Sequence, residues 1–363
     1  MLETLFQQTH RLLEVSELTH VFISILGLWL LFLILRSMIR IALMNRHYRD
    51  FFAELTGRAV YAAVALRLGR NRDAGALHRV LLWVFPAYLL SLIFIYFVGA
   101  MIGFTFLYWG TYAVNSWHQA FLASGSALNT LGFATPTSIA GQWLAVPEGA
   151  LGLGIVVFLF TFIPGYQAVI RSREDKTSWL YMRIGDRPTG VALLEWCQRA
   201  GIAGDMRDVW EGWEDWFRTL ADTHSVLPML TLSPSVQSGQ SWVLAAAAVL
   251  DAAALAVSST ETKDAESAKI CVRTGTRAFV AIADALGRAC PKQQGMARLV
   301  GERYGVARTC LCSAGVPLRS EVSQKTHGEE RPSLRTQYEE ALFFVARRTF
   351  VSLDGIPVET MER

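Results

Sequence analysis

The sequence predicts an all-α membrane protein, in which three transmembrane helices are followed by an α-helical cytoplasmic domain. Of its 363 residues, 52% are hydrophobic and only 18% are charged, whereas about a quarter of a soluble globular chain is charged. Nearly all the long apolar runs lie within residues 1–170, while residues 171–363 have the composition of a soluble domain. This distribution excludes a disordered chain, a disulfide-stapled secreted miniprotein and a wholly cytosolic enzyme.

Three apolar runs are long enough to cross a bilayer, whose hydrocarbon core requires about 20 helical residues. The first is centred on residues 21–35, and we assign residues 18–43 to a transmembrane helix that follows a tail at residues 1–17. No basic n-region precedes this run and no small-residue cleavage site follows it, so a retained span is favoured over a signal peptide. The second run covers residues 80–109 and the third covers residues 150–170.

Positive charge is distributed unevenly around these runs. Residues 36–79 contain nine Arg and three acidic residues, and residues 108–149 contain no Lys or Arg. Because Lys and Arg are enriched on the cytoplasmic side, we expect the basic segment at residues 44–79 in the cytoplasm, with the N-terminus outside and the C-terminus inside. This is the topology of an integral protein of a plasma membrane such as the bacterial inner membrane. The basic segment is expected either to bind anionic lipid headgroups at the inner leaflet or to continue the first two helices into the cytoplasm.

Residues 171–363 are expected to form the helical cytoplasmic domain. One helix is predicted from large apolar residues at helical spacing. These residues are Met206, Trp210, Trp213, Trp216, Phe217 and Leu220. Further amphipathic helices are predicted at residues 270–286 and 338–350, with polar linkers at residues 258–269 and 316–337. The run at residues 242–257 is rejected as a fourth span, because it is rich in Ala and carries Asp251 near its centre. We expect it to be a buried helix of this domain.

The segment at residues 115–137, between the second and third runs, is neither a span nor an ordinary loop. It is rich in Gly, Ser and Thr but also contains several large apolar residues. Residues 117–129 predict a short helix whose small side chains allow close packing. An extended stretch follows at residues 130–135, and Pro136 prevents helical continuation. Since non-helical backbone at membrane depth persists only inside protein or beside a watery cavity, we expect a re-entrant helix followed by a carbonyl-lined filter.

The order of span, short helix, Thr130-Leu131-Gly132-Phe133 and span resembles the pore module of the tetrameric potassium-channel superfamily. The resemblance covers residues 80–170, and the four residues match the first four positions of the Thr-Val-Gly-Tyr-Gly-Asp filter. Ala134 stands where that family has a second Gly, and Thr135 where it has Asp, so the preference for K⁺ over Na⁺ is left open. The segment is also similar to the single-Gly pore loops of Trk/Ktr-type potassium transporters, which carry four such modules in one chain.

The resemblance implies a homotetrameric cation channel with potassium as the expected ion, because this chain supplies only one module. It implies that the backbone of the filter binds the ion, and no other metal site is expected. The implied ion-binding residues are Thr130, Leu131, Gly132, Phe133 and Ala134.

The resemblance also implies a gate and an outer mouth. Inner helices of such channels bend at flexible points, which makes Gly154, Pro164 and Gly165 candidates for a hinge controlled by the cytoplasmic domain. Equally, transmembrane helices tolerate Pro and Gly without any such role. Four copies of Glu148 are expected to form an acidic ring at the outer mouth that concentrates cations. The alternative for Glu148 is a solvated loop carboxylate.

Two other functions are compatible with the sequence. Ala134 and Thr135 suggest a non-conducting membrane sensor or scaffold with a degenerate channel-like pore loop, and the single module also fits a subunit of a larger transporter. We expect no enzymatic activity, because the sequence has neither a nucleotide-binding motif nor a hydrolase nucleophile elbow. No cofactor beyond the permeant monovalent cation is expected, and a net charge of +3 gives no support to a nucleic-acid partner. The sequence does not specify a ligand of the cytoplasmic domain.

Overall fold

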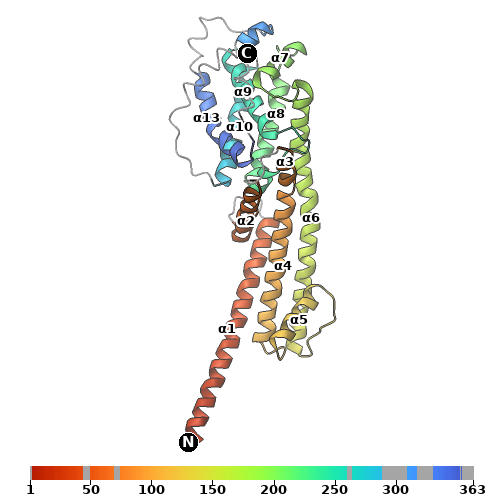
Figure 1. Cartoon of the computed structure of the whole chain (residues 1–363), viewed down its shortest axis with the longest axis vertical. Coiled ribbons are helices and arrows are strands. Elements are labelled where there is room, and N and C mark those ends of the chain that lie inside the picture. The colour runs from red at the N-terminus through yellow and green to blue at the C-terminus, as the bar shows by residue number, and fades with distance from the viewer. Residues whose placement is uncertain are drawn as a thin grey trace. The chain divides into compact units, whose positions relative to one another are not determined.

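The computed structural model describes residues 2–43, 50–68, 74–259, 264–287, 309–316, 330–351 and 353. All of its regular elements within these ranges are helices. The chain divides into two compact units, of which the first comprises Met1–Ala62 and Pro86–Gln167 and the second comprises Ala63–Phe85 and Ala168–Arg363. Figure 1 labels the helices of both units.

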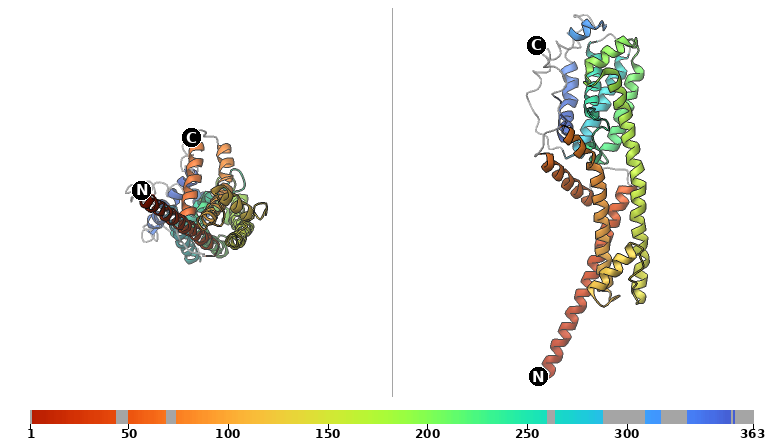
Figure 2. Two further views of the ribbon diagram at one scale, coloured as in Figure 1. Left: turned by 90° about the horizontal axis from the view of Figure 1, so that it is seen from below. Right: turned by 45° about the vertical axis from the view of Figure 1, so that its right-hand side comes forward.

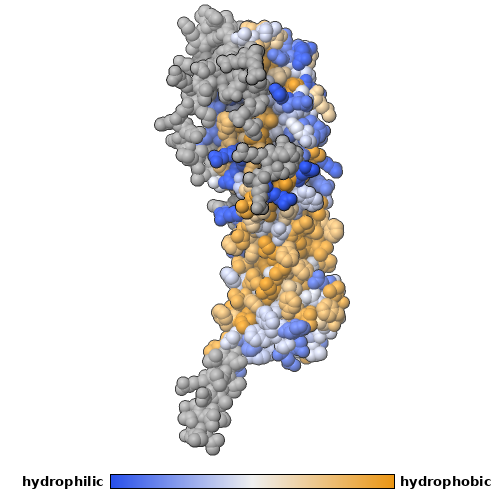
Figure 3. Space-filling model, in the orientation of Figure 1, coloured by the Kyte–Doolittle hydropathy of each residue, from blue (hydrophilic) through white to orange (hydrophobic). Residues whose placement is uncertain are grey.

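Three helices are long and apolar enough to cross a membrane, as the sequence predicts. They contain the candidate spans Glu17–Ile41, His78–Gly110 and Ile139–Ile184. Large apolar side chains are exposed along all three, with Phe22 66% exposed, Phe94 67% and Phe160 71%. Figure 3 shows this apolar surface in orange. Burying such a surface in lipid explains why it is tolerated, since soluble monomers rarely expose apolar patches of this extent.

The first unit is built on close contact between helix α1 (Leu2–Leu43) and helix α4 (Val84–Gly110). A Cβ atom at Gly27 would lie 2.7 Å from the Gly103 carbonyl oxygen, and one at Gly110 would lie 2.7 Å from the His20 carbonyl oxygen. Small residues let helix backbones approach in this way, and van der Waals packing then replaces the hydrophobic effect that lipid cannot supply. Helix α1 runs unbroken from Leu2, so the expected boundary between a tail at residues 1–17 and a helix at residues 18–43 is not a boundary of secondary structure.

The basic segment at residues 44–79 contains helix α2 (Phe51–Leu68) and the start of helix α3 (Ala74–Leu82), while residues 44–49 and 69–73 lie outside the described chain. Asp50 begins α2, because its Oδ1 accepts hydrogen bonds from the backbone N–H groups of Phe52 and Ala53. The same oxygen accepts from Ser37 Oγ at 2.7 Å, and Ser37 Oγ lies 2.6 Å from the Tyr96 hydroxyl. This N-cap therefore ties α2 to α1 and α4.

Helix α6 (Ile139–Ile184) is longer than the span expected at residues 150–170. It contains Pro147 and Pro164 and remains helical on both sides of each. A proline removes one backbone hydrogen bond but does not end a helix whose other residues are held by their neighbours. Residues Ile139–Gln167 of α6 belong to the first unit, and residues from Ala168 onwards belong to the second.

In the described residues, the helical core of the second unit includes the end of α6 and the following α-helices. These are α7 (Gly190–Arg199), α8 (Arg207–His224), α9 (Trp242–Ser259), α10 (Ala265–Ala285) and α13 (Glu330–Arg348). The predicted helix is present as α8, and its apolar row is buried, with Trp210 and Phe217 both 0% exposed. Gly275 lets α10 approach α8, because a Cβ atom there would lie 3.1 Å from the Phe217 ring.

Helix α9 lies inside this core, as Figure 1 shows, and the prediction of a buried helix is confirmed. Its residues from Trp242 to Val257 are buried apart from the half-exposed Leu244 and Asp251. The Asp251 carboxylate accepts a hydrogen bond of 2.7 Å from the Tyr338 hydroxyl and lies 3.8 Å from Arg335 Nη1. Asp251, which indicated that this run is not a membrane span, is thus paired at the edge of a helical core.

Both expected linkers are shorter than predicted within the described chain. Helix α10 already begins at Ala265, and helix α13 begins at Glu330. The remainder of these linkers, at residues 260–263 and 317–329, lies outside the described residues. Polar residues on an exposed helix face give the same local composition as a loop, which is why composition alone misplaced these ends.

Candidate functional site

Helix α5 (Trp117–Leu128) occupies the position predicted for the short helix between the second and third spans. Its N-terminus is capped by Ser116, whose hydroxyl accepts a hydrogen bond of 3.2 Å from the Gln119 N–H. Its face of small residues is buried against neighbouring helices of the first unit, with Ala120 and Ser124 both 0% exposed. Figure 2 shows α5 beside α4 and α6, and Ser124 makes contacts of 2.9 Å and 2.5 Å with these two helices.

The backbone turns sharply where α5 ends. Thr130 has a φ of 56° and Gly132 has a φ of 73°. Glycine adopts this left-handed region freely, but for a β-branched residue such as threonine it is an outlier. Such strain costs about 1–3 kcal/mol and is concentrated at functional sites in proteins. The strained threonine is the first of the four residues that match the filter pattern.

Three N–H groups at this segment, those of Thr130, Leu131 and Ala134, are held by α5. Thr130 N donates to the Ala127 carbonyl at 3.0 Å, and Leu131 N donates to the Ser126 carbonyl at 2.8 Å. The Ser126 hydroxyl in turn accepts a hydrogen bond of 3.0 Å from Ala134 N. These three backbone donors are thereby directed towards the helix.

The carbonyl groups of residues 130–133 differ from these N–H groups, because they have no hydrogen-bond partner among the described residues. Within the part of the chain that the structure describes, no donor reaches the carbonyl oxygens of residues 130–133. Thr130, Leu131, Gly132 and Phe133 are all exposed in a single chain, with the Leu131 and Phe133 side chains each 64% exposed. The segment therefore presents free acceptors and uncovered apolar side chains at the surface of one subunit, and Ala134 is half-buried beside it.

Two residues that position α5 and this segment were not predicted from the sequence pattern. Ser126 is 1% exposed and binds both ends of the segment, through its carbonyl to Leu131 and through its hydroxyl to Ala134. Gly152 of α6 lets α5 approach, because a Cβ atom there would lie 2.0 Å from the Leu128 carbonyl oxygen. The available signal was the small residues of α5, but from sequence these indicated close packing in general and not particular hydrogen bonds.

Glu148 does not have the exposed side chain that the sequence predicts. Its side chain is 0% exposed, and its Oε1 lies 2.5 Å from Ser124 Oγ. The expected ring at an outer mouth and the alternative of a solvated loop carboxylate both require an exposed side chain, so both are wrong for this arrangement. The physical reason is that α6 begins at Ile139, which places Glu148 on a helix face packed against α5 and not in a loop.

The three hinge candidates lie on exposed positions of α6 in the single chain. No atom lies within 4 Å of a Cβ built at Gly154 or at Gly165. The helix is continuous at Pro164, so the structure contains a potential weak point but no break there. These residues remain candidates on sequence grounds.

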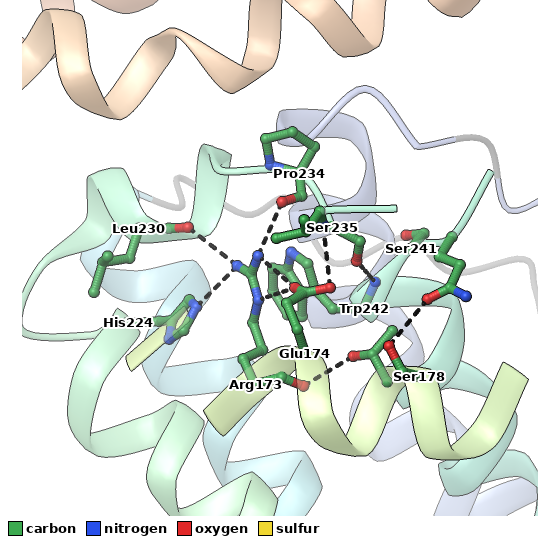
Figure 4. Close-up of polar contacts among 12 residues, drawn as sticks. Arg173, Glu174, Ser178, His224, Leu230, Pro234, Ser235, Ser241 and Trp242 are labelled. Carbon is green, nitrogen blue, oxygen red and sulfur yellow. Dashed lines mark hydrogen bonds and ion pairs between the residues drawn. The ribbon is translucent and has the colours of Figure 1, made fainter. Parts of the chain in front are cut away.

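A second polar cluster lies in the second unit, around the buried Arg173 of α6 (Figure 4). Its guanidinium pairs with Glu174 at 2.8 Å and donates to the carbonyl oxygens of Pro234 at 3.1 Å and Leu230 at 3.4 Å. Trp242 packs against the guanidinium, with 5.2 Å between Arg173 Cζ and the ring centroid. These contacts fasten the last turns of α6 to the helical core of this unit.

His224 adjoins this cluster and is held neutral. Arg173 Nη1 lies 3.4 Å from His224 Nε2, and a guanidinium only donates, so Nε2 must be the acceptor. The hydrogen on Nδ1 then points to Thr223 Oγ1 at 2.9 Å. Burial, and secondly the charge of Arg173, hold the pKa of His224 well below its usual range. The cluster has the character of a structural joint, since every polar group named here has a partner.

The described residues contain no side-chain cluster typical of a metal site. None of their His, Cys, Asp and Glu side chains form a group of three or more that could hold a metal ion. Cys197 and Cys271 are buried, and burial raises the pKa of the Cys197 thiol to about 12, which opposes nucleophilic reactivity. The chain matches no protein-family model, no curated protein and no solved structure.

Proposed function

We propose that four copies of this chain form a cation channel, with K⁺ as the favoured ion. The observation that carries the proposal is the polarity of the segment at residues 130–133. Its carbonyl oxygens meet no donor in the described chain, while the N–H groups of Thr130, Leu131 and Ala134 are bound to α5. A cation that sheds its water needs such a set of oriented carbonyl oxygens.

Fourfold association gives the segment what it lacks in one subunit. Each copy would supply one carbonyl per ring around a common axis, so that a complete site requires neighbouring subunits. Leu131 and Phe133, each 64% exposed in the single chain, would then be covered by those neighbours.

The proposed topology places the N-terminus outside and the second unit in the cytoplasm. Under this arrangement the second unit would control the pore through α6, because that helix is unbroken between the filter-bearing unit and the Arg173 cluster. The Arg-rich region at residues 36–79 would lie at the inner leaflet, where anionic headgroups attract positive side chains.

The experiment is a direct measurement of ion flux. Purified full-length protein, with its tetrameric state verified, is reconstituted into planar bilayers under a K⁺ gradient. The proposal predicts cation-selective current with a reversal potential that follows the K⁺ gradient. Tetramers that stay silent under every gradient and voltage would contradict it.

The second candidate is a non-conducting membrane sensor or scaffold. It is favoured by Ala134, which occupies the position of a second filter glycine and whose N–H is bound to Ser126. An alanine cannot freely adopt the left-handed conformation that glycine adopts. Silent tetramers in the bilayer experiment would support this candidate, and copurification of a second pore-loop protein would instead support a subunit of a larger transporter.

A further inference from the structure

The buried carboxyl group of Glu148 has no cationic partner in the described chain. Its side chain is 0% exposed, and the two polar groups that face it are the hydroxyls of Ser124 from α5 and Tyr108 from α4. Residues 108–149 contain no Lys or Arg, and the one histidine in that range, His118, is exposed. A buried carboxylate without a compensating charge is strongly disfavoured, and such groups are commonly neutralised by a proton.

The number of hydrogens available at Ser124 also indicates that Glu148 is protonated. Ser124 Oγ lies 2.9 Å from the Met101 carbonyl oxygen and 2.5 Å from Glu148 Oε1. A carbonyl oxygen and an ionised carboxylate both only accept, but a serine hydroxyl has a single hydrogen to donate. With an ionised Glu148, one of these two short oxygen–oxygen contacts would therefore contain no hydrogen and would be repulsive.

One added proton satisfies both contacts. If Oε1 carries it, Glu148 donates to Ser124 Oγ, and Ser124 donates its own hydrogen to Met101 O. The remaining carboxyl oxygen, Oε2, is then an acceptor that the Tyr108 hydroxyl faces from α4, although neither atom reaches hydrogen-bond geometry in this arrangement. These two buried groups without a partner complement each other as donor and acceptor.

We propose that Glu148 is a proton-binding site that fastens α5 between α4 and α6. Loss of the proton to solvent leaves a buried carboxylate and turns the Ser124 hydrogen away from Met101 towards Oε1. The contact between Ser124 Oγ and Met101 O then becomes repulsive, and α5 is loosened from α4. Glu148 acts here as a positioning residue, since it touches none of the residues 130–134.

The site is well placed to affect the candidate filter. Ser124 lies two residues before Ser126, which binds Leu131 and Ala134. A shift of α5 relative to α4 and α6 would therefore also move the segment at residues 130–134. The proton site itself follows from the packing of the first unit and does not depend on whether ions pass through the protein.

Infrared spectroscopy of the full-length protein tests the proposal without any flux measurement. At neutral pH the wild type should show a C=O stretching band of a protonated buried carboxyl group that is missing from Glu148→Gln. Glutamine is the matched variant, because its amide can donate to Ser124 Oγ as the protonated acid does. Absence of a difference band at neutral pH would show that Glu148 is ionised and would overturn the proposal.

Two further measurements also test whether Glu148 binds this proton. Ser124→Ala should retain the band but shift its frequency, since the acid loses its hydrogen-bond acceptor. Because the folded wild type retains a proton that the unfolded chain releases above a pH of about 4.3, thermal stability should fall as the pH rises from there, until the folded protein also releases this proton. Glu148→Gln should lack this loss. Equal pH dependence in the wild type and Glu148→Gln would contradict the proton site even if both variants fold well.

Discussion

At the scale of single residues, His224 shows how the surroundings of a side chain set a pH dependence. Burial and the neighbouring Arg173 hold its pKa well below the usual range, so the folded protein keeps it neutral. The unfolded chain binds a proton there below about pH 6.5. The unfolded state is therefore favoured as the pH falls below that value, by up to about 1.4 kcal/mol per pH unit.

We predict that His224→Gln flattens this acid-side loss of stability while lowering stability overall. Glutamine offers an oxygen where Nε2 accepts from Arg173 but has no titrating group. The measurement is the denaturation midpoint of the full-length protein at neutral and mildly acidic pH. His118→Gln is the matched control, since His118 is exposed, and should keep the wild-type slope. Identical slopes in the wild type and His224→Gln would argue against this origin.

Residue identities predicted burial well where spacing was informative and poorly where it was not. Trp210, Trp213 and Phe217 repeat at helical spacing, and all three are buried. The acidic side chain of Asp251 correctly indicated that α9 is a helix of the soluble core. The position of Glu148 was not predicted in this way, because no residue near it in the sequence indicates that its side chain is buried. Its burial depends on Ser124, which is 24 residues away, and no local pattern reports such a contact.

At the scale of elements, the contact between α5 and α6 depends on the absence of a side chain at Gly152. A Cβ atom there would lie 2.0 Å from the Leu128 carbonyl oxygen. We predict that Gly152→Ala forces the two helices apart and lowers the free energy of unfolding by about 1–3 kcal/mol, as overpacking does. Thermal unfolding of the purified protein in detergent measures this loss.

Gly154→Ala is the matched control on the same helix. No atom lies within 4 Å of a Cβ built at Gly154, and alanine favours a helix by up to about 1 kcal/mol over glycine. This variant should be at least as stable as the wild type. If the two variants lose equal stability, close approach of α5 and α6 is not what Gly152 provides.

Element types were predictable from the sequence, but element ends were not. The apolar run of α9 and the short helix α5 appeared at the expected positions, because length and small-residue content are local properties. Helix α6 exceeded its predicted span at both ends. Its extension beyond Ile170 is stabilised by burial of Arg173 and Leu180 in the second unit, a tertiary effect that local composition does not contain.

At the scale of the whole molecule, the proposed three-span topology requires α5 and the second unit to face opposite sides of the membrane. We predict that an impermeant maleimide added to intact cells labels Gln142→Cys but not the native, exposed Cys312. Permeabilised cells should be labelled at Cys312. Cys197 and Cys271 should contribute little background, because burial raises the pKa of both thiols. Labelling of both positions from the same side would refute the three-span topology.

The proposed channel passes cations along the backbone of residues 130–134. Gly132 has a φ of 73°, and no atom lies within 4 Å of a Cβ built there. Alanine would therefore cause no clash within the chain but would disfavour this conformation by about 1–2 kcal/mol. Ala134→Gly is the complementary change, since it restores the flexibility of a two-glycine filter.

The most direct test is the reversal potential under a K⁺/Na⁺ gradient, measured together with tetramer yield for the parent, Gly132→Ala and Ala134→Gly. We predict normal tetramer yield in all three proteins, lost or strongly altered permeation in Gly132→Ala, and a greater preference for K⁺ over Na⁺ in Ala134→Gly. Unchanged permeation in Gly132→Ala would show that ions do not pass along this backbone and would contradict the proposed channel.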